Sequence, residues 1–413
     1  MSNKRVLVTG GAGYIGSHTV VELINAGYEV VIVDNFSNSD ASSLDGVEKI
    51  TGVRPEFVEV DCCDKEALRK VFERYDFASL IHFAAYKAAR IPYSRNHDSA
   101  ICMAYGGPYS HDISNIFPNF DADPYNPDSY DFACTDESIL ACLEAGTETF
   151  FRLGQTIEHQ IKKHGTLPPK DFNKWAVICE HIIRHYNEGW GNGLNLNMQY
   201  WEIWNEADLD PDDALDKRTW GGTKAQFFDL YEITAKHLKG CFPHLKIGGP
   251  ALAFRRDWAD DFLCEMQKRN VPIDFFSWHI YCIEPAQMID EAEKIKEILV
   301  KNGYGEIESI INEWNYVKEW EEGFVNSLEI IHGLKGAAFV LSCMCEAQKC
   351  DAVDMLMYYD TRPSAFNGAF DFYTVKPLKG YYPLYWYGMF YDMAAEVRSQ
   401  TECENIYYLC RTN

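Results

Sequence analysis

The chain has 413 residues, 47% of them hydrophobic and 14% aromatic, so it can bury one large barrel or two separate cores. Its formal net charge of −24 excludes nucleic acid as an expected partner, because phosphate binding needs clusters of basic side chains. No apolar run approaches the roughly 20 residues that span a bilayer, and no signal peptide precedes the first apolar run. We therefore expect a cytoplasmic protein with no membrane partner.

The fourteen cysteines do not form a metal-binding or disulfide pattern. Cys142, Cys179, Cys264 and Cys343 stand singly within apolar segments, and no Cys-x-x-Cys pair occurs. We expect reduced, mostly buried thiols and no metal site.

Residues 4–87 alternate between short β-rich runs and amphipathic stretches, which predicts a parallel sheet with helical crossovers. The expected strands are Arg5–Thr9, Glu29–Val33, Glu56–Val60 and Ser79–Phe83. The expected helices are Tyr14–Ala26, a segment around Leu44–Thr51, and Lys65–Tyr75.

A glycine-rich turn joins the first strand to the first helix. Gly10, Gly13 and Gly16 follow the spacing Gly-x-x-Gly-x-x-Gly, which permits a tight turn and close approach of backbone N–H groups to a pyrophosphate. Asp34 ends the second strand 18 residues after Gly16, where it can accept hydrogen bonds from ribose hydroxyls. The pattern predicts half of a dinucleotide-binding, Rossmann-type sheet.

With Ser37-Asn-Ser, Val60-Asp61 and Phe83-Ala-Ala-Tyr-Lys87, this stretch closely resembles the N-terminal part of the UDP-glucose 4-epimerases, which are extended short-chain dehydrogenases. The resemblance covers about the first 87 residues. It implies NAD contacts from Gly10, Gly13, Gly16, Asp34, Asn35, Asp61, Phe83, Ala84 and Lys87. That family needs a Tyr-x-x-x-Lys pair, and no tyrosine of this chain has a lysine four residues later. We therefore expect no epimerase activity.

After Lys87 the repeating units become longer. The expected strands are Pro92–His97, Thr149–Gly154, Gln199–Asn205, Lys246–Gly249, Asp274–His279, Ser309–Glu313 and Met355–Tyr359. Expected helices between them include Asp171–Tyr186, Lys224–Leu238, Trp258–Lys268 and Ala286–Lys301. Seven strands are one fewer than an eight-stranded β/α barrel contains.

Two of these strands end in a glutamate. Glu206 follows the alternating run Tyr200-Trp-Glu-Ile-Trp and is preceded by Asn205, and Glu313 follows Ile310-Ile-Asn. Glycoside hydrolysis needs two such carboxyl groups, one to protonate the leaving oxygen and one to attack the anomeric carbon or activate water. On the fourth and seventh strands of a barrel the two groups can lie about 5 Å apart, the separation for a retaining double displacement.

The Trp-Asn-Glu motif followed by a second strand-end glutamate resembles the clan of retaining glycosidases built on this barrel, and within it family 39, the β-xylosidases and their relatives. Further similar segments are Lys246-Ile-Gly-Gly-Pro-Ala251, Asp274-Phe-Phe-Ser-Trp-His-Ile-Tyr281 and Ile310-Ile-Asn-Glu-Trp-Asn315. The likeness runs from about Ile91 to the end of the chain.

The resemblance implies a role for each matching residue. Glu206 would be the general acid/base, Glu313 the nucleophile, and Asn205 a donor to the sugar 2-hydroxyl. The remaining site residues would be Tyr281, which orients the nucleophile, and His97 and His279, which line the sugar site.

The family's sugar platform is altered. Tyr358 and Tyr359 stand where the resemblance implies a tryptophan beneath the sugar, and Phe366 and Trp320 are candidates for stacking in its place.

In the family's order, Pro92–His97 corresponds to the second barrel strand, so the first strand and its helix are absent. Ser79–Phe83 cannot take the place of this first strand. Only about eight residues separate it from Pro92–His97, whereas the connection between two parallel strands needs about a dozen or more. The expected fold is α/β: a partial NAD-binding domain over 1–87, a (β/α)8-type barrel over 91–398 that lacks its first strand and helix, and a stub of a C-terminal β-sandwich over 399–413.

Three functional interpretations remain open. The first is a retaining β-glycoside hydrolase that acts on a carbohydrate without a cofactor and could form a homo-oligomer. The second is an epimerase-like fragment that binds NAD. The third is a misfolded fusion with neither activity.

Overall fold

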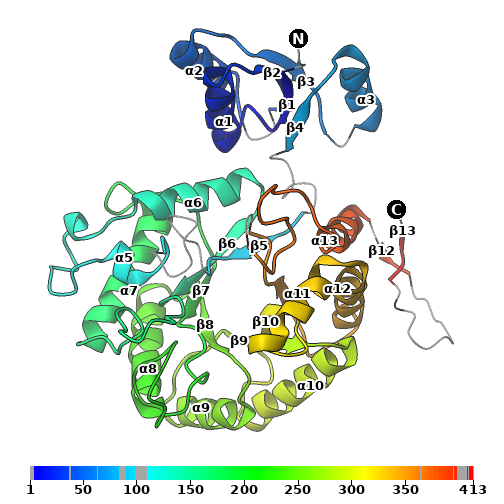
Figure 1. The fold of residues 1–413 in the computed structure, drawn as a ribbon. Coiled ribbons are helices and arrows are strands. Elements are labelled where there is room, and N and C mark those ends of the chain that lie inside the picture. The colour runs from blue at the N-terminus through cyan, green and yellow to red at the C-terminus, as the bar shows by residue number, and fades with distance from the viewer. Residues whose placement is uncertain are drawn as a thin grey trace. The chain divides into compact units, whose positions relative to one another are not determined.

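The computed structural model describes residues 4–36, 39–62, 64–82, 90–97, 109–362, 365–393, 395–397, 407 and 409–412 (Figure 1). The chain divides into two compact units. The sheet unit comprises Met1–Pro92 and Ile139–Glu148, and the barrel unit comprises Tyr93–Ser138 and Thr149–Asn413. The predicted domain limits, 1–87, 91–398 and 399–413, stay predictions.

The sheet unit is a four-stranded parallel sheet in the order β3-β2-β1-β4. Its strands are β1 (Arg5–Thr9), β2 (Glu29–Asp34), β3 (Glu56–Glu59) and β4 (Ser79–His82). Its helices are α1 (Tyr14–Asn25), α2 (Ser42–Thr51) and α3 (Lys65–Arg74). The strand order reverses beside β1, which is where doubly wound sheets bind ligands. The predicted elements are confirmed to within two residues, except that Phe83 lies outside the described residues.

The barrel unit contains a seven-stranded parallel sheet in the order β11-β10-β9-β8-β7-β6-β5. Its strands are β5 (Tyr93–Arg95), β6 (Glu148–Leu153), β7 (Tyr200–Ile203), β8 (Lys246–Leu252), β9 (Phe275–Cys282), β10 (Glu308–Tyr316) and β11 (Met355–Tyr358). All seven predicted strands are present, but the prediction that Glu313 ends its strand is wrong, because β10 continues three residues further, to Tyr316. The prediction that Ser79–Phe83 does not fill the vacant first position is also confirmed for the described part, because β4 pairs with β1.

Helices surround these strands as an outer ring in Figure 1. The longer ones are α6 (Ala133–Glu144), α7 (Phe172–Glu188), α8 (Lys224–Cys241), α9 (Arg256–Lys268), α10 (Pro285–Lys301), α11 (Phe324–His332), α12 (Leu334–Ala347) and α13 (Tyr381–Gly388). Shorter elements are α5 (Ile113–Ile116), η1 (Pro127–Ser129), η2 (Glu321–Gly323), η3 (Met389–Asp392) and the antiparallel pair β12 (Ala395–Glu396) and β13 (Arg411–Thr412). Most of the predicted stub 399–413 lies outside the described residues.

Large side chains fill the barrel interior near the start of its strands. This cluster draws on six of the seven strands. Its buried members are Phe150, Tyr200, Phe275, Ile310 and Met357, and the half-buried Tyr93 and Met355 pack against them. Three of the aromatic rings pack within 5.2–5.7 Å of one another between their centroids. Because β5 and β11 both contribute, the two end strands of the sheet share one core, and no strand of the described residues lies between them.

Each described cysteine is a free thiol. The prediction that most are buried is wrong for these residues: four are buried, two are exposed, and the others are half-buried. Among the described residues no single helix has the length and apolarity to cross a membrane, although the bent pair Glu321–His332 and Leu334–Ala347 passes that test jointly. Cytoplasmic location and self-association stay predictions.

Candidate active site

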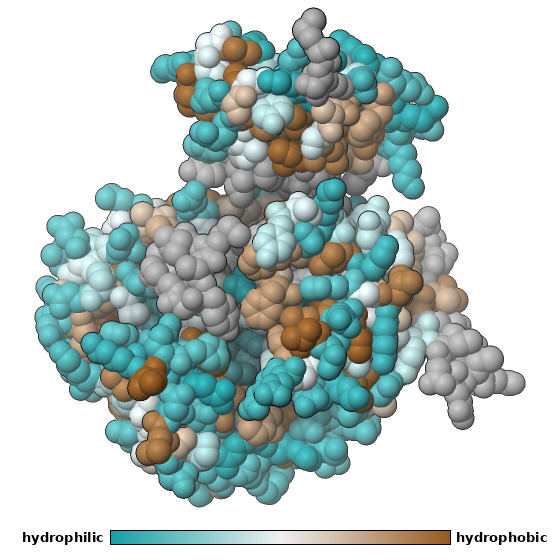
Figure 2. Space-filling model, in the orientation of Figure 1, coloured by the Kyte–Doolittle hydropathy of each residue, from teal (hydrophilic) through white to brown (hydrophobic). Residues whose placement is uncertain are grey.

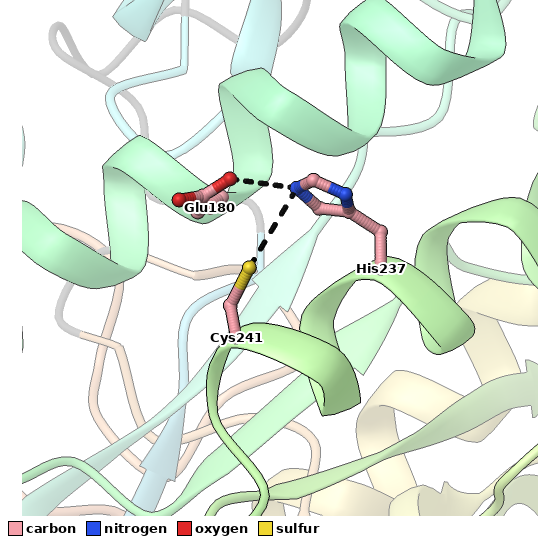
Figure 3. A group of neighbouring side chains, drawn as sticks. All are labelled: Glu180, His237 and Cys241. Atoms are coloured by element: carbon pink, nitrogen blue, oxygen red, sulfur yellow. Dashed lines mark hydrogen bonds and ion pairs between the residues drawn. The ribbon is translucent and has the colours of Figure 1, made fainter.

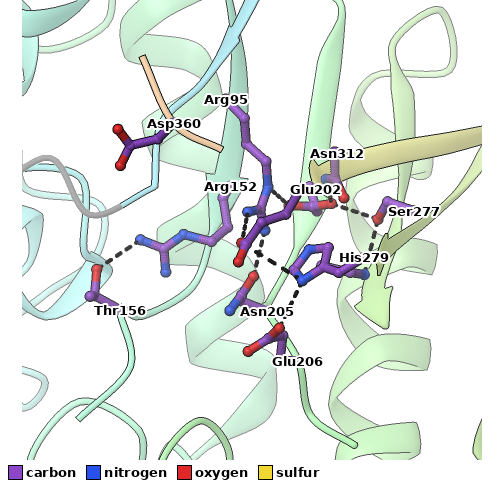
Figure 4. Close-up of polar contacts among 12 residues, drawn as sticks. Arg95, Arg152, Thr156, Glu202, Asn205, Glu206, Ser277, His279, Asn312 and Asp360 are labelled. Atoms are coloured by element: carbon purple, nitrogen blue, oxygen red, sulfur yellow. Dashed lines mark hydrogen bonds and ion pairs between the residues drawn. The ribbon is translucent and has the colours of Figure 1, made fainter. Parts of the chain in front are cut away.

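Polar side chains gather at the carboxyl ends of the barrel strands, the end at which such barrels carry their chemistry (Figure 4). Arg95 of β5 is at the centre of this group. Its Nε lies 2.7 Å from Glu202 Oε2, its Nη2 lies 2.6 Å from Asn205 Oδ1, and its Nη1 lies 3.4 Å from Glu313 Oε2. One guanidinium therefore holds groups from β7, the segment after β7, and β10.

The segment after β7 turns sharply. The predicted strand Gln199–Asn205 was too long at this end, because Trp204 takes φ +73° and Glu206 takes φ +48°, and extended pairing cannot continue through left-handed residues. The Trp204 indole is buried and donates to the Thr219 carbonyl, which fixes the turn. Backbone strain of about 1–3 kcal/mol per residue is typical of positions where the surrounding structure enforces a functional side-chain direction.

A bulge in β10 determines the direction in which the Glu313 side chain points. Ile311 pairs with Trp278 and Glu313 pairs with His279, so Asn312 is an extra residue in the register. Successive side chains of a regular strand face opposite ways, and one inserted residue changes that alternation. The bulge lets Asn312 contact Glu202 at 2.5 Å inside the barrel while Glu313 also faces the site.

Glu206 and Glu313 are bridged by His279 of β9. The His279 Nδ1 atom lies 2.8 Å from Glu206 Oε1 and 3.7 Å from Glu313 Oε2. Carboxylate oxygens of the two glutamates lie within 4.8 Å of each other. Burial lowers the pKa of His279, so its ring is neutral at neutral pH and its Nδ1 can donate a hydrogen bond to Glu206.

Glu313 has the more elaborate set of partners. Tyr281 donates its hydroxyl to Glu313 Oε1 at 2.5 Å, and Arg95 faces Oε2. Burial raises the pKa of Glu313, and the charge of Glu206 raises it further, whereas His279, Arg95 and the Tyr281 hydroxyl act in the opposite direction. The same types of side chain can bind a metal ion, but here the Arg95 guanidinium already supplies the cation beside Glu313.

Arg95 and Glu202 were not predicted as site residues. Glu202 is fully buried and accepts hydrogen bonds from Arg95, Ser277 and Asn312. The charges of Glu202 and Glu313 raise the pKa of Arg95 although burial acts to lower it. The sequence did contain a signal for both residues, because each is a charged residue on the interior-facing side of a barrel strand. Burying a charge there costs free energy unless the charge is paired.

Two further buried groups support the site. Arg152 of β6 pairs with Asp112 at 2.7 Å, and its Nη2 reaches Thr156. Asp208, two residues after Glu206, accepts backbone N–H groups at 2.7–3.1 Å from the residues 253–255 that precede α9. These bonds fix the loops that follow β6, β7 and β8.

His97 lies two residues after the end of β5 and is buried, with its ring centroid 6.1 Å from that of Tyr359. Burial, with Arg95 and Arg152 nearby, lowers the pKa of His97 well below its usual value. Trp320 is 53% exposed and packs edge-on against Tyr281 at 4.9 Å between centroids. Of the two stacking candidates, Trp320 therefore lies beside a residue that contacts Glu313. Phe366 packs edge-on against Phe324, which stacks on Trp320.

Tyr358 does not take the place of the absent tryptophan platform. It packs edge-on against buried Trp314, and burial raises its pKa. Tyr359 lies just beyond the end of β11.

In the sheet unit the glycine turn has the geometry of a phosphate cradle. Gly10 takes φ +71°, and Gly13 precedes the first residue of α1. A Cβ on Gly16 would lie 2.1 Å from the Gly10 carbonyl oxygen, so only glycine fits this close packing of helix on turn. The turn is of the kind that admits a pyrophosphate at the N-terminus of α1, although here the Glu144 carboxylate lies against it, with Oε1 1.9 Å from where a Cβ on Gly13 would be.

The structure describes only some of the other residues that were predicted to contact NAD. Asp34 accepts the Ala12 N–H at 3.1 Å and the Phe36 N–H at 3.0 Å, which ties the end of β2 to the turn. Asn35 donates to Asp61 at 3.1 Å. Phe83, Ala84 and Lys87 lie outside the described residues.

Two protein-family models match the chain. Residues 118–379, more than half of the chain, match the glycosyl hydrolases family 39, and residues 7–99 match the GDP-mannose 4,6 dehydratase family. The first match thus begins after β5, and the second extends past the join expected near Lys87.

Curated relatives match the N-terminal part. The UDP-glucose 4-epimerase of Bacillus subtilis is 40% identical over 146 residues, which is 29% of this chain and 43% of that protein. The human UDP-glucose 4-epimerase is 52% identical over 91 residues, 21% of this chain and 26% of that protein. The chain spans less than half the length of these relatives.

Solved structures share the barrel fold. A glucosidase from Croceicoccus marinus has a TM-score of 0.62 at 22% identity, covering 76% of this chain and 64% of that one. A family 39 β-xylosidase from Caulobacter crescentus has a TM-score of 0.53 at 18% identity, covering 74% of this chain and 67% of that one. Strand-end carboxylates, a seven-stranded barrel sheet and the family match agree: this chain belongs to glycosyl hydrolase family 39 and carries an N-terminal region homologous to the UDP-glucose 4-epimerases.

Proposed function

We propose that this protein hydrolyses β-glycosidic bonds with retention of configuration at the anomeric carbon. The observation that carries the proposal is the separation of less than 4.8 Å between carboxylate oxygens of Glu206 and Glu313. Retaining enzymes place their two carboxyl groups about 5–5.5 Å apart, whereas inverting enzymes leave about 6.5–9.5 Å for a water molecule.

The partners of the two glutamates assign their roles. Glu313 faces the Arg95 cation and accepts the Tyr281 hydroxyl, both of which favour the ionised form that a nucleophile needs. Glu206 contacts the neutral His279 ring and lies at the end of a short, rigid turn. We assign Glu313 as the nucleophile and Glu206 as the general acid and base.

In the first step the Glu206 carboxyl proton passes to the leaving glycosidic oxygen while a Glu313 oxygen bonds to the anomeric carbon. In the second step Glu206 takes a proton from water, the water oxygen bonds to the anomeric carbon, and the bond to Glu313 breaks. No cofactor takes part. Asn205, held by Arg95 through its Oδ1, has its amide nitrogen left to donate to a sugar 2-hydroxyl.

The substrate we propose is a neutral β-linked sugar such as a β-xyloside. Trp320, half-exposed beside Tyr281, offers an apolar face of the kind that packs against sugar rings. The solved relatives whose descriptions name a glucosidase and a β-xylosidase fit this class.

The test uses aryl β-xyloside and aryl β-glucoside with the full chain and three variants. Glu313→Gln is expected to abolish turnover, and Glu206→Ala to lower it about 10²–10⁴-fold for poor leaving groups and much less for good ones. Glu306→Gln is the matched control, since Glu306 is exposed just before the opposite end of β10 and should leave the rate unchanged. The proposal fails if no aryl β-glycoside is hydrolysed, or if the first-formed sugar has inverted configuration.

A second candidate function rests on the glycine turn. The close packing of Gly16 on Gly10 and the tie between Asp34 and the turn support dinucleotide binding without epimerase chemistry. When bound, NAD would supply hydride transfer, and in this unit Gly10, Gly13 and Gly16 would approach its pyrophosphate and Asp34 its ribose. Calorimetric titration of the full chain with NAD tests it, and an absence of binding heat rejects it without affecting the hydrolase proposal.

A further inference from the structure

Glu180, His237 and Cys241 form a cluster on two neighbouring barrel helices, separate from the residues of the active site (Figure 3). Glu180 lies on α7, and His237 and Cys241 lie one turn apart on α8. The His237 Nε2 atom is 2.7 Å from Glu180 Oε2 and 4.0 Å from Cys241 Sγ. One ligand atom of each residue lies within 4.8 Å of the other two.

The geometry excludes a cysteine nucleophile with a histidine base. Such a triad needs the thiol at one ring nitrogen and the carboxylate at the other, so that the carboxylate orients the ring. Here both Sγ and the carboxylate oxygen approach the same nitrogen, Nε2. Three electron-pair donors whose ligand atoms lie within 4.8 Å of one another can instead surround a cation after small side-chain shifts.

We propose that Glu180, His237 and Cys241 bind a transition-metal ion of the zinc class, with water as the fourth ligand. Thiolate, imidazole and carboxylate are the three ligand types that zinc uses, at about 2.3 Å for sulfur and about 2.0–2.2 Å for nitrogen and oxygen. A tetrahedral ion would hold N and S roughly 3.6 Å apart and N and O roughly 3.3 Å apart. The present separations of 4.0 and 2.7 Å need shifts of only a few tenths of an ångström in side chains.

The local charges accommodate a cation. Cys241 is the last residue of α8, where the negative end of the helix dipole lies. Among the described residues Arg184 is a nearby competing cation: it bonds to the other Glu180 oxygen, Oε1, and to Glu188, and it also approaches the Cys241 thiol, so a bound ion would displace it from the thiol. Burial acts to raise the pKa of Glu180, but the bonds from Arg184 and His237 lower it, so this carboxylate is ionised at neutral pH.

The cluster is accessible to a metal ion from solvent. The His237 side chain is 32% exposed, and that of Glu180 is 12% exposed. Burial raises the pKa of Cys241, and metal binding would release its proton. The cluster holds no disulfide, because Cys241 is a free thiol.

The ion would act on stability and not on catalysis. Cys241 ends α8 shortly before β8 begins at Lys246, so the cluster lies toward the start of the strands, away from the end that carries Glu206 and Glu313. It would tie α7, which leads into β7, to α8, which leads into β8. A ligand that binds only the folded chain raises its apparent stability.

The probe is Co²⁺ added to the metal-free full chain, with displacement by Zn²⁺. We expect one equivalent of cobalt to give tetrahedral d–d bands and a sulfur-to-cobalt charge-transfer band, and Zn²⁺ to remove both. Cys241→Ser should remove the charge-transfer band, and His237→Gln should weaken cobalt binding at least tenfold. Cys134→Ser is the matched control, since Cys134 is an exposed thiol on α6 outside the cluster, and it should leave both bands unchanged.

Two readouts keep the proposal testable if a variant folds poorly. In the unaltered chain Zn²⁺ should protect Cys241 from alkylation, as mapped by mass spectrometry, while Cys134 stays reactive. Zn²⁺ should also raise the melting temperature without changing hydrolysis of aryl glycosides. The proposal is overturned if cobalt gives no charge-transfer band, if Cys241→Ser retains it, or if Zn²⁺ leaves Cys241 as reactive as Cys134.

Discussion

The two units build on the same element, a parallel strand whose carboxyl end carries polar groups, yet they gather those groups differently. In the sheet unit the glycine turn and Asp34 follow two adjacent strands of an open sheet. In the barrel unit curvature brings β5, β7, β9 and β10 around one space, so that Arg95, Glu206, His279 and Glu313 interact directly. A site that needs side chains from several directions therefore depends on near-closure of the sheet.

The two units also differ in what their interiors contain, since the described residues of the barrel combine an aromatic cluster with a buried network of charged groups. The barrel fills its interior with the aromatic cluster described above. Figure 2 shows apolar groups, in brown, on the surface of both units. The exposed large apolar side chains include Ile50, Val53 and Phe72 in the sheet unit, and Ile161 and Leu215 in the barrel unit. Changing an exposed ion pair of the sheet unit, such as Arg74 with Glu56, should therefore cost less stability than changing the buried pair of Arg95 and Glu202 in the barrel.

The largest expected effect comes from removing the charge at the centre of that network. Arg95→Leu leaves Glu202 and Glu313 without their buried cation, and we expect a loss of about 3–5 kcal/mol in the free energy of unfolding of the barrel unit. Chemical denaturation followed by tryptophan fluorescence measures it, since buried tryptophans such as Trp201 and Trp204 belong to this unit.

The matched control is Arg74→Leu in the sheet unit. Arg74 is 67% exposed and lies 3.3 Å from Glu56, so its loss should cost less than about 1 kcal/mol. Adding Glu202→Leu to Arg95→Leu should recover part of the stability, because the second change removes one uncompensated buried charge. Equal losses for Arg95 and Arg74 would contradict the contrast between the two units.

A smaller loss of stability is expected from a change in the sheet unit that should leave hydrolysis by the barrel unit unaltered. Gly16→Ala places a Cβ 2.1 Å from the Gly10 carbonyl oxygen, which forces the backbone apart at a cost of about 1–3 kcal/mol and should remove the proposed NAD binding. Gly46→Ala in α2 is the control, because nothing lies within 4 Å of its Cβ and alanine favours a helix. Both variants should hydrolyse aryl glycosides at the unaltered rate. A loss of hydrolysis in Gly16→Ala alone would show that the units are energetically coupled.

The sequence was sufficient to predict the strands and both catalytic candidates. Apolar runs and alternation locate elements such as β1 and β9 to within a few residues, and the strand-end motifs identify Glu206 and Glu313. These features depend on residues near one another in the chain.

What could not be predicted depends on register and backbone conformation. The bulge at Asn312 decides that two consecutive residues both face the interior, and no local pattern reveals it. The left-handed turn at Trp204 shortens β7, although tryptophan ordinarily favours extended backbone. Arg95 lies at the centre of the site because near-closure of the sheet brings β5 against β11 and close to β10, where Arg95 contacts Glu313, a residue 218 positions away.

The smallest expected effect concerns the pH dependence of Glu313. Because burial raises its pKa in the folded chain, folding favours the protonated form, and that contribution is fully present below the ordinary glutamate range and is lost as the pH rises through the raised pKa. Glu313→Gln keeps a neutral group at every pH, so we expect it to melt above the unaltered chain at about pH 7 and level with it at about pH 4. Thermal unfolding of both chains at the two pH values measures the difference, with the exposed Glu306→Gln as control. Hydrolysis needs the ionised form, so the rate should fall as the pH drops through the same raised pKa. If Glu313→Gln instead lowers the melting temperature at about pH 7, then Arg95 and Tyr281 outweigh burial, and the ionised carboxylate stabilises the barrel that it serves.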